Sequence, residues 1–437
     1  VFTGTLRDNL LHGLRFRPVR EVDGPERRLR RREAALTGAP PDDVADDWVD
    51  PQETGYPDRE AVEARMLELA RGLGLEDDLY GIGLGSRLDP AAAPAFARRL
   101  LELRREIARS EELGAMRDDF IDVWREDAYV ANGGVGENLF FALPTDPALG
   151  WSDLVGERRV QRALEEAGVR DLLVELGVDV CEALISLFEG VGAESDLFKR
   201  YGMFPRSETP AIEAIVRKAR ARGPRGLRRA ERTRMLEIAV DYCSARFRLG
   251  VMRGRGRVAA VLAARPKLRE AMAGDARIAP FDADAYVPAF SIAENVFFGP
   301  VKLDRRDSWG PFKARVDALM AEVGLREPVL RAGLDQRVGE GGVALNAVQR
   351  RKLGLARALM KRPAALVLDG PLAGSSDGDR AARAMLRGAL GPEAALVWSA
   401  EGEAAAADAT HLIRVDAAGR VREEGAPGAP VDGGSDD

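Results

Sequence analysis

The sequence contains few of the side chains that build metal sites and covalent active sites. Its 437 residues include two cysteines, Cys181 and Cys243, and two histidines, His12 and His411. Two cysteines in unrelated contexts form neither a disulfide framework nor a zinc-ligand pattern, which is typical of a protein from a reducing compartment. Two histidines so far apart in sequence nearly exclude a histidine-based metal site or a catalytic triad.

Long apolar runs and a strong net charge are also absent. No apolar run approaches the roughly 18 residues that a membrane span needs, and no signal peptide is visible. The 71 acidic residues outnumber the 65 basic ones, so the composition does not indicate a nucleic-acid partner. The basic runs at 27–33 and 217–234 are interpreted as solvated helix faces in preference to lipid-binding or nucleic-acid-binding patches. The composition is otherwise that of a soluble globular protein with two or three domains.

One short element recurs three times. Its pattern is a small residue, an aliphatic residue, any residue, an acid, Asn and then two or three apolar residues. The copies are TLRDNLLHGL from Thr5, GVGENLFFAL from Gly134 and SIAENVFFGP from Ser291, with Asn9, Asn138 and Asn295 at the shared position. In the first and third copies a Thr or Ser precedes the acid by three residues, which predicts a capping box at a helix start. Three unrelated helix starts are the alternative, and the shared Asn argues against it.

The segments between the copies are predicted to be mainly helical. Residues 21–60 are the exception, because they are rich in Pro and Asp and predict an exposed loop or a disordered insert. In 58–125 the apolar residues recur at helical spacing. Within 155–275, which carries no motif, the strongest amphipathic helix is predicted over Arg232–Met252. The predicted buried face in 58–125 includes Val62, Met66, Leu69 and Leu73.

Helices and strands alternate after Ser291, which indicates an α/β arrangement. A helix over 311–323 leads to a glycine-rich loop, and a second helix is predicted from 347 to 361, because Pro363 stops it. Residues 364–369 and 394–399 are short strands that are apolar on both faces, as in a buried parallel sheet. Residues 411–425 are predicted to form a hairpin that turns near Gly419.

Five segments from residue 281 onward together carry a resemblance to a known family in their order and spacing. FSIAENVFFG resembles the segment after the Q-loop, GEGGVALNAVQRRKLGLARALMKRP the LSGGQ loop and its helix, ALVLDGP the Walker B strand, VWSA the H-loop strand and RVREEGAP the final hairpin. Residues 281–425 therefore resemble the later two-thirds of an ABC transporter nucleotide-binding domain. The resemblance implies an α/β fold, namely a partial P-loop-NTPase-like ABC cassette with a large, mainly α-helical insertion.

The layout is similar to that of large bacterial ABC proteins that fuse a membrane domain to a cassette. The expected organisation is a post-Q-loop segment at 1–20, a loop and helical segment of the first copy at 21–127, a mainly helical insertion with a degraded repeat at 128–280, the C-terminal cassette part at 281–425 and a flexible tail at 426–437. No G-x-x-x-x-G-K-[ST] phosphate-binding loop occurs in the sequence. Because that loop comes earlier in the family, and because the chain begins at Val1, we expect a fragment whose upstream part is missing.

The resemblance assigns nucleotide contacts to two places. The LSGGQ position would cover the γ-phosphate of ATP held by a partner cassette, through a helix N-terminus. Asn346 can cap that helix, whereas Ala347 and Val348 add side chains where glycines would allow close approach. Asp369 stands at the Walker B position and would hold Mg²⁺ through water, with a turn-forming Asp as the alternative. The full set implied for nucleotide binding is Leu345, Asn346, Ala347, Val348, Gln349, Asp369 and Asp377, the last as a D-loop Asp one residue out of register.

The positions tied to hydrolysis are altered together. Gly370 occupies the place of the Glu that orients the attacking water, and Ala400 occupies the place of the H-loop His. Glu401 would repel phosphate, and His411 is interpreted as structural. No catalytic residue is therefore assigned, and weak or lost hydrolysis is expected. An active ATPase in which Glu401 or Asp377 supplies the missing group is an alternative.

The favoured hypothesis is the ATP-binding subunit or domain of a membrane ABC transporter, an exporter. It implies ATP and Mg²⁺ as cofactors and a place on the cytoplasmic face of the inner (plasma) membrane. The implied partners are a second cassette, in a homo- or heterodimer, and a transmembrane domain encoded upstream in the same chain, with no nucleic acid. A scaffold or regulatory protein with a catalytically dead cassette is the alternative, so enzymatic activity stays open at this point.

Overall fold

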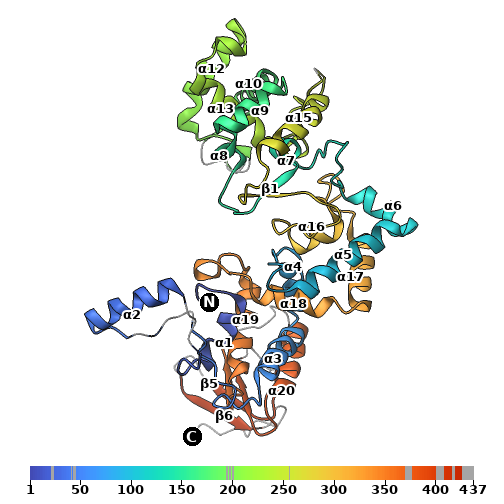
Figure 1. Cartoon of the computed structure of the whole chain (residues 1–437). Coiled ribbons are helices and arrows are strands. Elements are labelled where there is room, and N and C mark those ends of the chain that lie inside the picture. Colours follow the sequence, from blue (N-terminus) through green and yellow to red (C-terminus); the bar gives the residue numbers. More distant parts are fainter. Residues whose placement is uncertain are drawn as a thin grey trace. The chain divides into compact units, whose positions relative to one another are not determined.

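The chain forms two compact units (Figure 1). The computed structural model describes residues 1–20, 24–40, 42, 46–192, 195, 198, 201–254, 256–369, 376–399, 408–415 and 419–425. Unit 1 combines Val1–Gly83 with Leu330–Asp437, and unit 2 is the intervening Leu84–Val329. Unit 2 is therefore inserted between the two sequence segments that form unit 1. The domain boundaries expected from the sequence stay a prediction.

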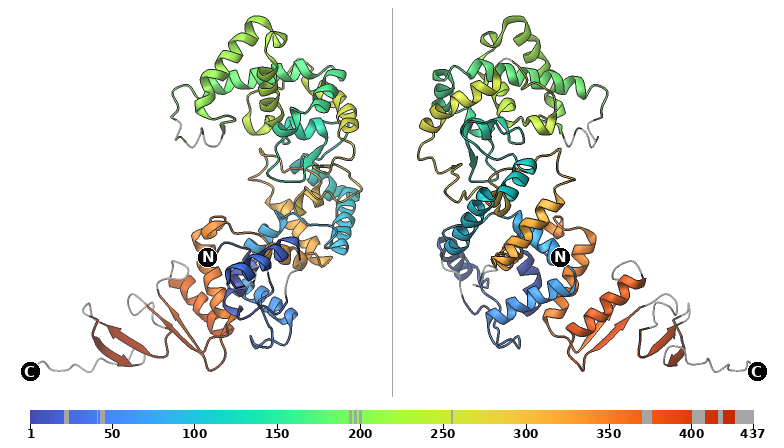
Figure 2. Two further views of the ribbon diagram at one scale, coloured as in Figure 1. Left: turned by 60° about the vertical axis from the view of Figure 1, so that its left-hand side comes forward. Right: turned by 90° about the vertical axis from the view of Figure 1, so that its right-hand side faces the viewer.

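Unit 1 combines helices from both ends of the chain with two small sheets (Figure 2). Two of its helices, α4 and α18, carry the chain out to unit 2 and back. The elements of unit 1 are α1 (Leu6–Leu11), η1 (His12–Leu14), α2 (Pro25–Thr37), α3 (Arg59–Gly72), α4 (Glu76–Leu84), α18 (Arg326–Leu334), η4 (Glu340–Gly342), α19 (Ala347–Met360), β3 (Ala365–Leu368), α20 (Ser376–Ala389), β4 (Ala395–Trp398), β5 (Leu412–Val415) and β6 (Val421–Gly425).

Unit 2 is mainly helical. Its elements are α5 (Pro94–Arg109), α6 (Glu111–Phe120), α7 (Val135–Phe140), β1 (Ala142–Pro144), α8 (Trp151–Val155), α9 (Arg158–Glu166), α10 (Arg170–Leu187), η2 (Arg206–Glu208), α12 (Thr209–Arg222), η3 (Pro224–Gly226), α13 (Arg229–Asp241), α14 (Ser244–Phe247), α15 (Arg257–Ala271), β2 (Ile278–Pro280), α16 (Ile292–Phe297) and α17 (Gly310–Glu322).

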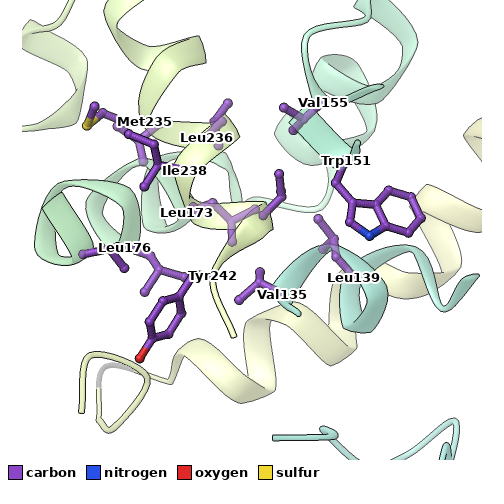
Figure 3. Close-up of a cluster of buried hydrophobic side chains, with 14 of the residues drawn as sticks. Val135, Leu139, Trp151, Val155, Leu173, Leu176, Met235, Leu236, Ile238 and Tyr242 are labelled. Atoms are coloured by element: carbon purple, nitrogen blue, oxygen red, sulfur yellow. The ribbon is translucent and has the colours of Figure 1, made fainter. Parts of the chain in front are cut away.

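The helical periodicity read from the sequence corresponds to buried faces. In α3, Val62, Met66 and Leu69 are all buried, and Asp58 caps the helix by accepting a hydrogen bond from the backbone N–H of Ala61. In unit 2 the core between α7, α8, α10 and α13 is apolar and closely packed (Figure 3). Gly177 of α10 lies so near α13 that a Cβ atom there would be 2.0 Å from the carbonyl oxygen of Met235. These two helices therefore pack by direct backbone approach.

The strands form three two-stranded sheets among the described residues. β3 and β4 are parallel, with Ala365 opposite Ala395 and Leu368 opposite Trp398. β5 and β6 form the predicted antiparallel hairpin, with Gly419 in the left-handed region at the turn. β1 and β2 pair antiparallel although they are more than a hundred residues apart.

Two local predictions were wrong. The stretch 21–60 contains α2, a 13-residue helix that begins with Pro25 and ends at Gly38 in a left-handed C-cap, so flanking turn residues delimit a helix in this Pro-rich region. The helix predicted over Arg232–Met252 is interrupted, because α13 ends at Asp241. The backbone of Tyr242 turns away to accept a hydrogen bond from the N–H of Val135, and Cys243 forms a β-bridge with Gly134. Tertiary pairing thus overrides the apolar periodicity.

The three sequence repeats adopt one structure. The carboxylates of Asp8, Glu137 and Glu294 each accept a hydrogen bond from the backbone N–H three residues before them. The amides of Asn9, Asn138 and Asn295 each clamp one residue upstream, accepting from its N–H and donating to its carbonyl oxygen; the clamped residues are Phe2, Val130 and Val287. The prediction that the shared Asn marks a true repeat is confirmed.

Each repeated helix packs on a long helix, and in two of the three cases that long helix follows a different copy of the repeat in the sequence. α1 packs on α19, α16 packs on α5, and α7 packs on α15. The same bridge precedes each pair, since Thr5 pairs with Arg337, Ser291 with Arg87 and Gly134 with Cys243. The first and third copies have therefore exchanged their long helices: α5 follows the first copy in sequence but packs on the third, and α19 follows the third copy but packs on the first. The second copy packs on α15, which follows it in the sequence. We call each assembly of a short repeated helix and a long helix a module.

Candidate functional site

The LSGGQ-like loop of unit 1 depends on three glycines. Gly339, Gly341 and Gly342 all have positive φ angles, between 59° and 75°, a region that side chains with a Cβ rarely adopt. Arg350 binds the end of this loop, donating from Nη1 to the carbonyl oxygen of Leu345 at 2.6 Å. The loop is thus shaped by backbone geometry and tied to its own helix.

The N-terminus of α19 is closed by a complete capping box. Asn346 Oδ1 accepts from the N–H of Gln349 at 2.9 Å, and Gln349 Oε1 accepts from the N–H of Asn346 at 2.9 Å. Gln349 also donates from Nε2 to Asp78 Oδ1 of α4 at 2.9 Å. The Gln349 side chain therefore uses both its oxygen and its nitrogen inside unit 1, and sequence reasoning gave no signal for Asp78 as its partner.

The other loop residues divide between interior and surface. Leu345 is buried and, with apolar residues of α1, α3 and α4, lines a cavity of about 30 Å³, which is large enough to hold a water molecule. Ala347 is exposed, and so is Val348, whose exposed fraction is 57%. Val343 earlier in the loop is 78% exposed. The surface at this helix N-terminus is consequently more apolar than a phosphate-binding loop requires.

Asp369 follows β3 at the carboxyl end of the parallel pair. Its Oδ1 accepts a hydrogen bond from Ser399 Oγ at 3.1 Å, and the Ser399 N–H donates to the carbonyl oxygen of Leu368 at 3.0 Å. Ser399 follows β4, so the two side chains meet where the parallel strands end. The sequence contained the signal for Ser399, because it directly follows the strand expected beside Asp369.

The remaining predicted positions are described only in part. Gly370, Ala400 and Glu401 lie outside the described residues, and Asp377 is in α20 with a side chain that also lies outside the description. His411 is exposed at the start of β5. Among the described side chains no hydrogen bond joins Asp369 to the loop 345–349. The part of the chain that is described contains no cluster of three or more metal-ligating His, Cys, Asp or Glu side chains.

Two buried arginines in unit 2 were missed by sequence reasoning. Arg104 of α5 and Arg265 of α15 each bind three main-chain carbonyl groups of an extended segment and the Asn of the packed repeat. Burial lowers the pKa of both guanidinium groups to about 10. The sequence did contain a signal for these two arginines. Each lies within a long helix, and a similar acidic segment follows each helix in the sequence.

Comparison with known proteins gives a partial likeness. An 81-residue stretch is 38% identical to the ATP-dependent lipid A-core flippase of Pseudomonas syringae pv. syringae (strain B728a) and 37% identical to that of Pseudomonas putida (strain KT2440). Each match covers 18% of this chain and 12% of the relative. No protein-family model and no solved structure matches the chain significantly. At a coarse level the likeness relates the chain to ABC exporters. No described helix is long and apolar enough to cross a membrane.

Proposed function

We propose that this chain is the ATP-binding part of a membrane ABC transporter, an exporter, whose own cassette hydrolyses ATP slowly or not at all. The observation that carries the proposal is the arrangement around Asp369, where α19 leads into β3 and β3 ends beside Ser399, the residue after the parallel β4. Ligands of open parallel sheets bind at the carboxyl ends of the strands. The likeness to relatives named as ATP-dependent flippases supports the same assignment.

The residues at the strand ends fit a magnesium ion. Asp369 offers an exposed carboxylate and Ser399 a hydroxyl, and Mg²⁺ prefers oxygen donors while keeping several of its waters. When bound, Mg²⁺ would neutralise charge on the phosphates of ATP. In this proposal Asp369 would hold Mg²⁺ through water, and Ser399 would hold the Asp369 carboxylate in place.

The residues at the start of α19 fit a triphosphate poorly. Val348 and Ala347 carry exposed side chains where the backbone would have to approach an anion, and the capping box already occupies Asn346 and Gln349. With Gly370 in place of a carboxylate, nothing at that position can orient a water. Slow or absent turnover, with some retained nucleotide contact, follows from this set of residues.

The proposal includes partners and a location. A second cassette would cover the exposed Val343 and Val348, since interface cores favour apolar side chains over charged ones. A membrane domain would hold the chain at the cytoplasmic face of the inner membrane. A non-transport scaffold with a dead cassette is the second candidate, favoured by the same apolar loop surface. The reading frame on the 5′ side of Val1 separates them, because membrane spans and a phosphate-binding loop there would support the transporter.

The direct test is nucleotide binding and phosphate release by the protein encoded by the complete gene. Asp369→Asn should weaken binding of an ATP analogue in Mg²⁺ and leave binding in EDTA unchanged. Glu393→Gln removes an equal charge from the exposed turn before β4 and should have no effect. Gly370→Glu should raise phosphate release by about 10²-fold, since a catalytic carboxylate contributes about that much. Substantial turnover in the wild type that Gly370→Glu leaves unaltered would refute the lost-hydrolysis part.

A further inference from the structure

The helix α2 of unit 1 has one buried side and one exposed apolar side. Arg27 and Ala34 are buried, and Arg27 Nη1 forms an ion pair with Asp46 Oδ2 at 2.7 Å. Leu29 and Leu36 are exposed, with exposed fractions of 59% and 87%. The members of each pair are seven residues apart and share one side of the helix, and an offset of two residues places the pairs roughly 200° apart. The two leucines therefore face away from the contact that holds α2, which stands apart from the other helices of unit 1 (Figure 1).

Arginines flank this leucine pair. Arg32 lies three residues after Leu29 and four before Leu36, a spacing that puts it beside both on a helix surface. Arg28 lies four residues before Arg32 on the same side. Glu33 flanks the pair on its other side and is the one acid among the described side chains of α2. The exposed arginines of α2 are Arg28, Arg30, Arg31 and Arg32. The exposed surface of α2 thus combines leucines with an excess of positive charge.

The segment around α2 differs in charge from the chain as a whole. Residues 15–37 contain eight arginines and four acids, although the chain has a formal charge of −6. The same segment carries two further exposed apolar side chains, Phe16 and Val19. The N–H of Val19 donates to the carbonyl oxygen of Asp47 at 2.7 Å, next to the Asp46 that binds α2. Exposed apolar side chains and positive charge therefore gather in one short part of unit 1.

The second basic run, 217–234 in unit 2, lacks this combination. Part of it belongs to α12, whose large apolar residues Ile212 and Val216 are buried. No large apolar side chain of the run itself is exposed, since Leu227 is buried as well. A basic run without exposed apolar residues is usually a solvated helix face. The exposed leucines distinguish α2 from such a face.

A helix with arginines beside exposed leucines suits the surface of an anionic membrane. Such a helix lies in the plane of the interface, with its apolar side chains about 5–10 Å deep at the boundary between headgroups and acyl chains. Arginines at the headgroup level are attracted by the negative surface potential. A stable protein interface buries about 800 Å² per partner, far more than two leucine side chains supply. Binding to nucleic acid would rest on phosphate contacts, to which leucines contribute nothing.

We propose that α2 binds anionic lipid bilayers, with Leu29 and Leu36 at the boundary of the acyl chains and Arg28 and Arg32 at the headgroup phosphates. The inference is independent of the proposed function, because it requires neither a nucleotide nor a membrane domain. A failure of nucleotide binding would leave it untouched, and a failure of lipid binding would leave the nucleotide site untouched.

The test is cosedimentation of the whole chain with vesicles made of equal parts of phosphatidylglycerol and phosphatidylcholine. The wild type should bind them at least about tenfold more tightly than vesicles of phosphatidylcholine alone, and added salt should weaken the binding. Leu29→Gln combined with Leu36→Gln should weaken binding by about tenfold, because the apolar contribution is lost. Arg28→Gln combined with Arg32→Gln should weaken it by about tenfold as well. Glu33→Gln should strengthen it by about fivefold, since it removes the flanking negative charge.

Matched variants in unit 2 serve as controls. Arg217→Gln combined with Arg222→Gln removes the same charge from α12, and Leu187→Gln replaces an exposed leucine at the end of α10. Neither should change vesicle binding. Circular dichroism should show the same helix content for every variant, because all of the substituted residues lie at the surface.

A second measurement locates the contact without any substitution. Amide hydrogen exchange over 25–37 should slow when anionic vesicles are added, whereas exchange over α12 should stay the same. Equal vesicle binding by the wild type and the double leucine variant would overturn the proposal, as would the absence of binding to anionic vesicles. Self-association that depends on Leu29 and Leu36 and occurs without vesicle binding would also overturn it, and would assign this side of α2 to a second copy of the chain.

Discussion

Arg104 and Asn295 bind each other twice across 191 residues of sequence. Arg104 Nε donates to the carbonyl oxygen of Asn295 at 2.5 Å, and Nη2 donates to its side-chain Oδ1 at 2.9 Å. Asn295 in turn clamps Val287, so one guanidinium and one amide fix the helix α16 and the segment before it. This pairing joins the long helix of the first copy to the short helix of the third.

Arg104→Ala should destabilise unit 2 by about 2–4 kcal/mol, because it leaves several buried carbonyl groups without a donor. Arg104→Lys should cost nearly as much, since an ammonium cannot reach all of these acceptors. Arg105→Ala, at the neighbouring half-exposed residue with an ion pair at 3.8 Å, should change the free energy of unfolding by less than about 0.5 kcal/mol. Urea unfolding followed by circular dichroism gives the comparison, and equal effects at 104 and 105 would contradict it.

Asn138→Asp should be destabilising by about 2–4 kcal/mol although the two side chains have almost the same shape. The Asn138 amide donates to the carbonyl oxygens of Val130 and Gly134 at 2.8 and 2.9 Å, and a carboxylate can donate to neither. The charged form would also be buried. Thermal unfolding at pH 8 measures this loss, and a smaller loss at low pH, where the carboxyl is protonated, should accompany it. An unchanged midpoint at pH 8 would show that the clamp is dispensable.

Glu137 should make the stability of unit 2 fall as the pH rises. Burial, with a further contribution from the charge of Glu294, raises the pKa of Glu137 to about 7, against 4.5 in the unfolded chain. The folded state then holds a proton that the unfolded state has lost between these values. The contribution is complete below about pH 4.5 and is lost as the pH rises to about 7.

Glu137→Gln should remove this pH dependence. Relative to the wild type, the variant should gain about 1–2 kcal/mol between pH 5 and pH 8, less than the full pKa difference because the residue is only half-buried. Urea titrations of both proteins across this range measure the difference. For Glu112→Gln, at an exposed position in α6, the difference from the wild type in the free energy of unfolding should stay constant across this pH range. A flat difference for Glu137→Gln would mean that its carboxyl titrates normally.

Local features of the fold were predictable because local interactions determine them. The capping boxes at Thr5 and Ser291, the apolar face of α3 and the turn at Gly419 each depend on residues within a few positions of one another. The shared Asn of the three copies was visible for the same reason. What it binds, the backbone seven or eight residues upstream, follows from the same short range.

The long-range pairings could not be predicted from one sequence. Nothing near Asn295 indicates that Arg104 will bind it in preference to Arg265, since both arginines follow the same pattern. The interruption at Tyr242 depends likewise on Val135, which is remote in sequence. For the candidate site, Asp369 and Asn346 could be located by their strand and helix, whereas the engagement of Gln349 with Asp78 depends on how α4 packs.

The exchange of α5 and α19 between the first and third copies predicts that unit 1 can fold when unit 2 is deleted. The segments GIGLGSRL at 81–88 and RAGLDQRV at 331–338 align at a constant separation of 250 residues, so Leu84 corresponds to Leu334. They also lie together, because a Cβ on Gly333 would be 3.2 Å from the backbone nitrogen of Gly83. A deletion of 85–334 that joins Leu84 to Asp335 therefore connects α4 directly to the loop before α19.

In the shortened chain, the module of α1 and α19 no longer contains the long insertion between α4 and α19. We therefore expect this chain to fold. Its bridge between Thr5 and Arg337 needs no residue of unit 2. A cooperative thermal transition and a helical circular dichroism spectrum are the expected results. Deleting 85–336 instead shortens the connection between α4 and Arg337, the bridge partner of Thr5, by two residues, and should lower the midpoint of this transition. If both deletions behave alike, the correspondence of Leu84 with Leu334 does not describe how the insertion joins its host.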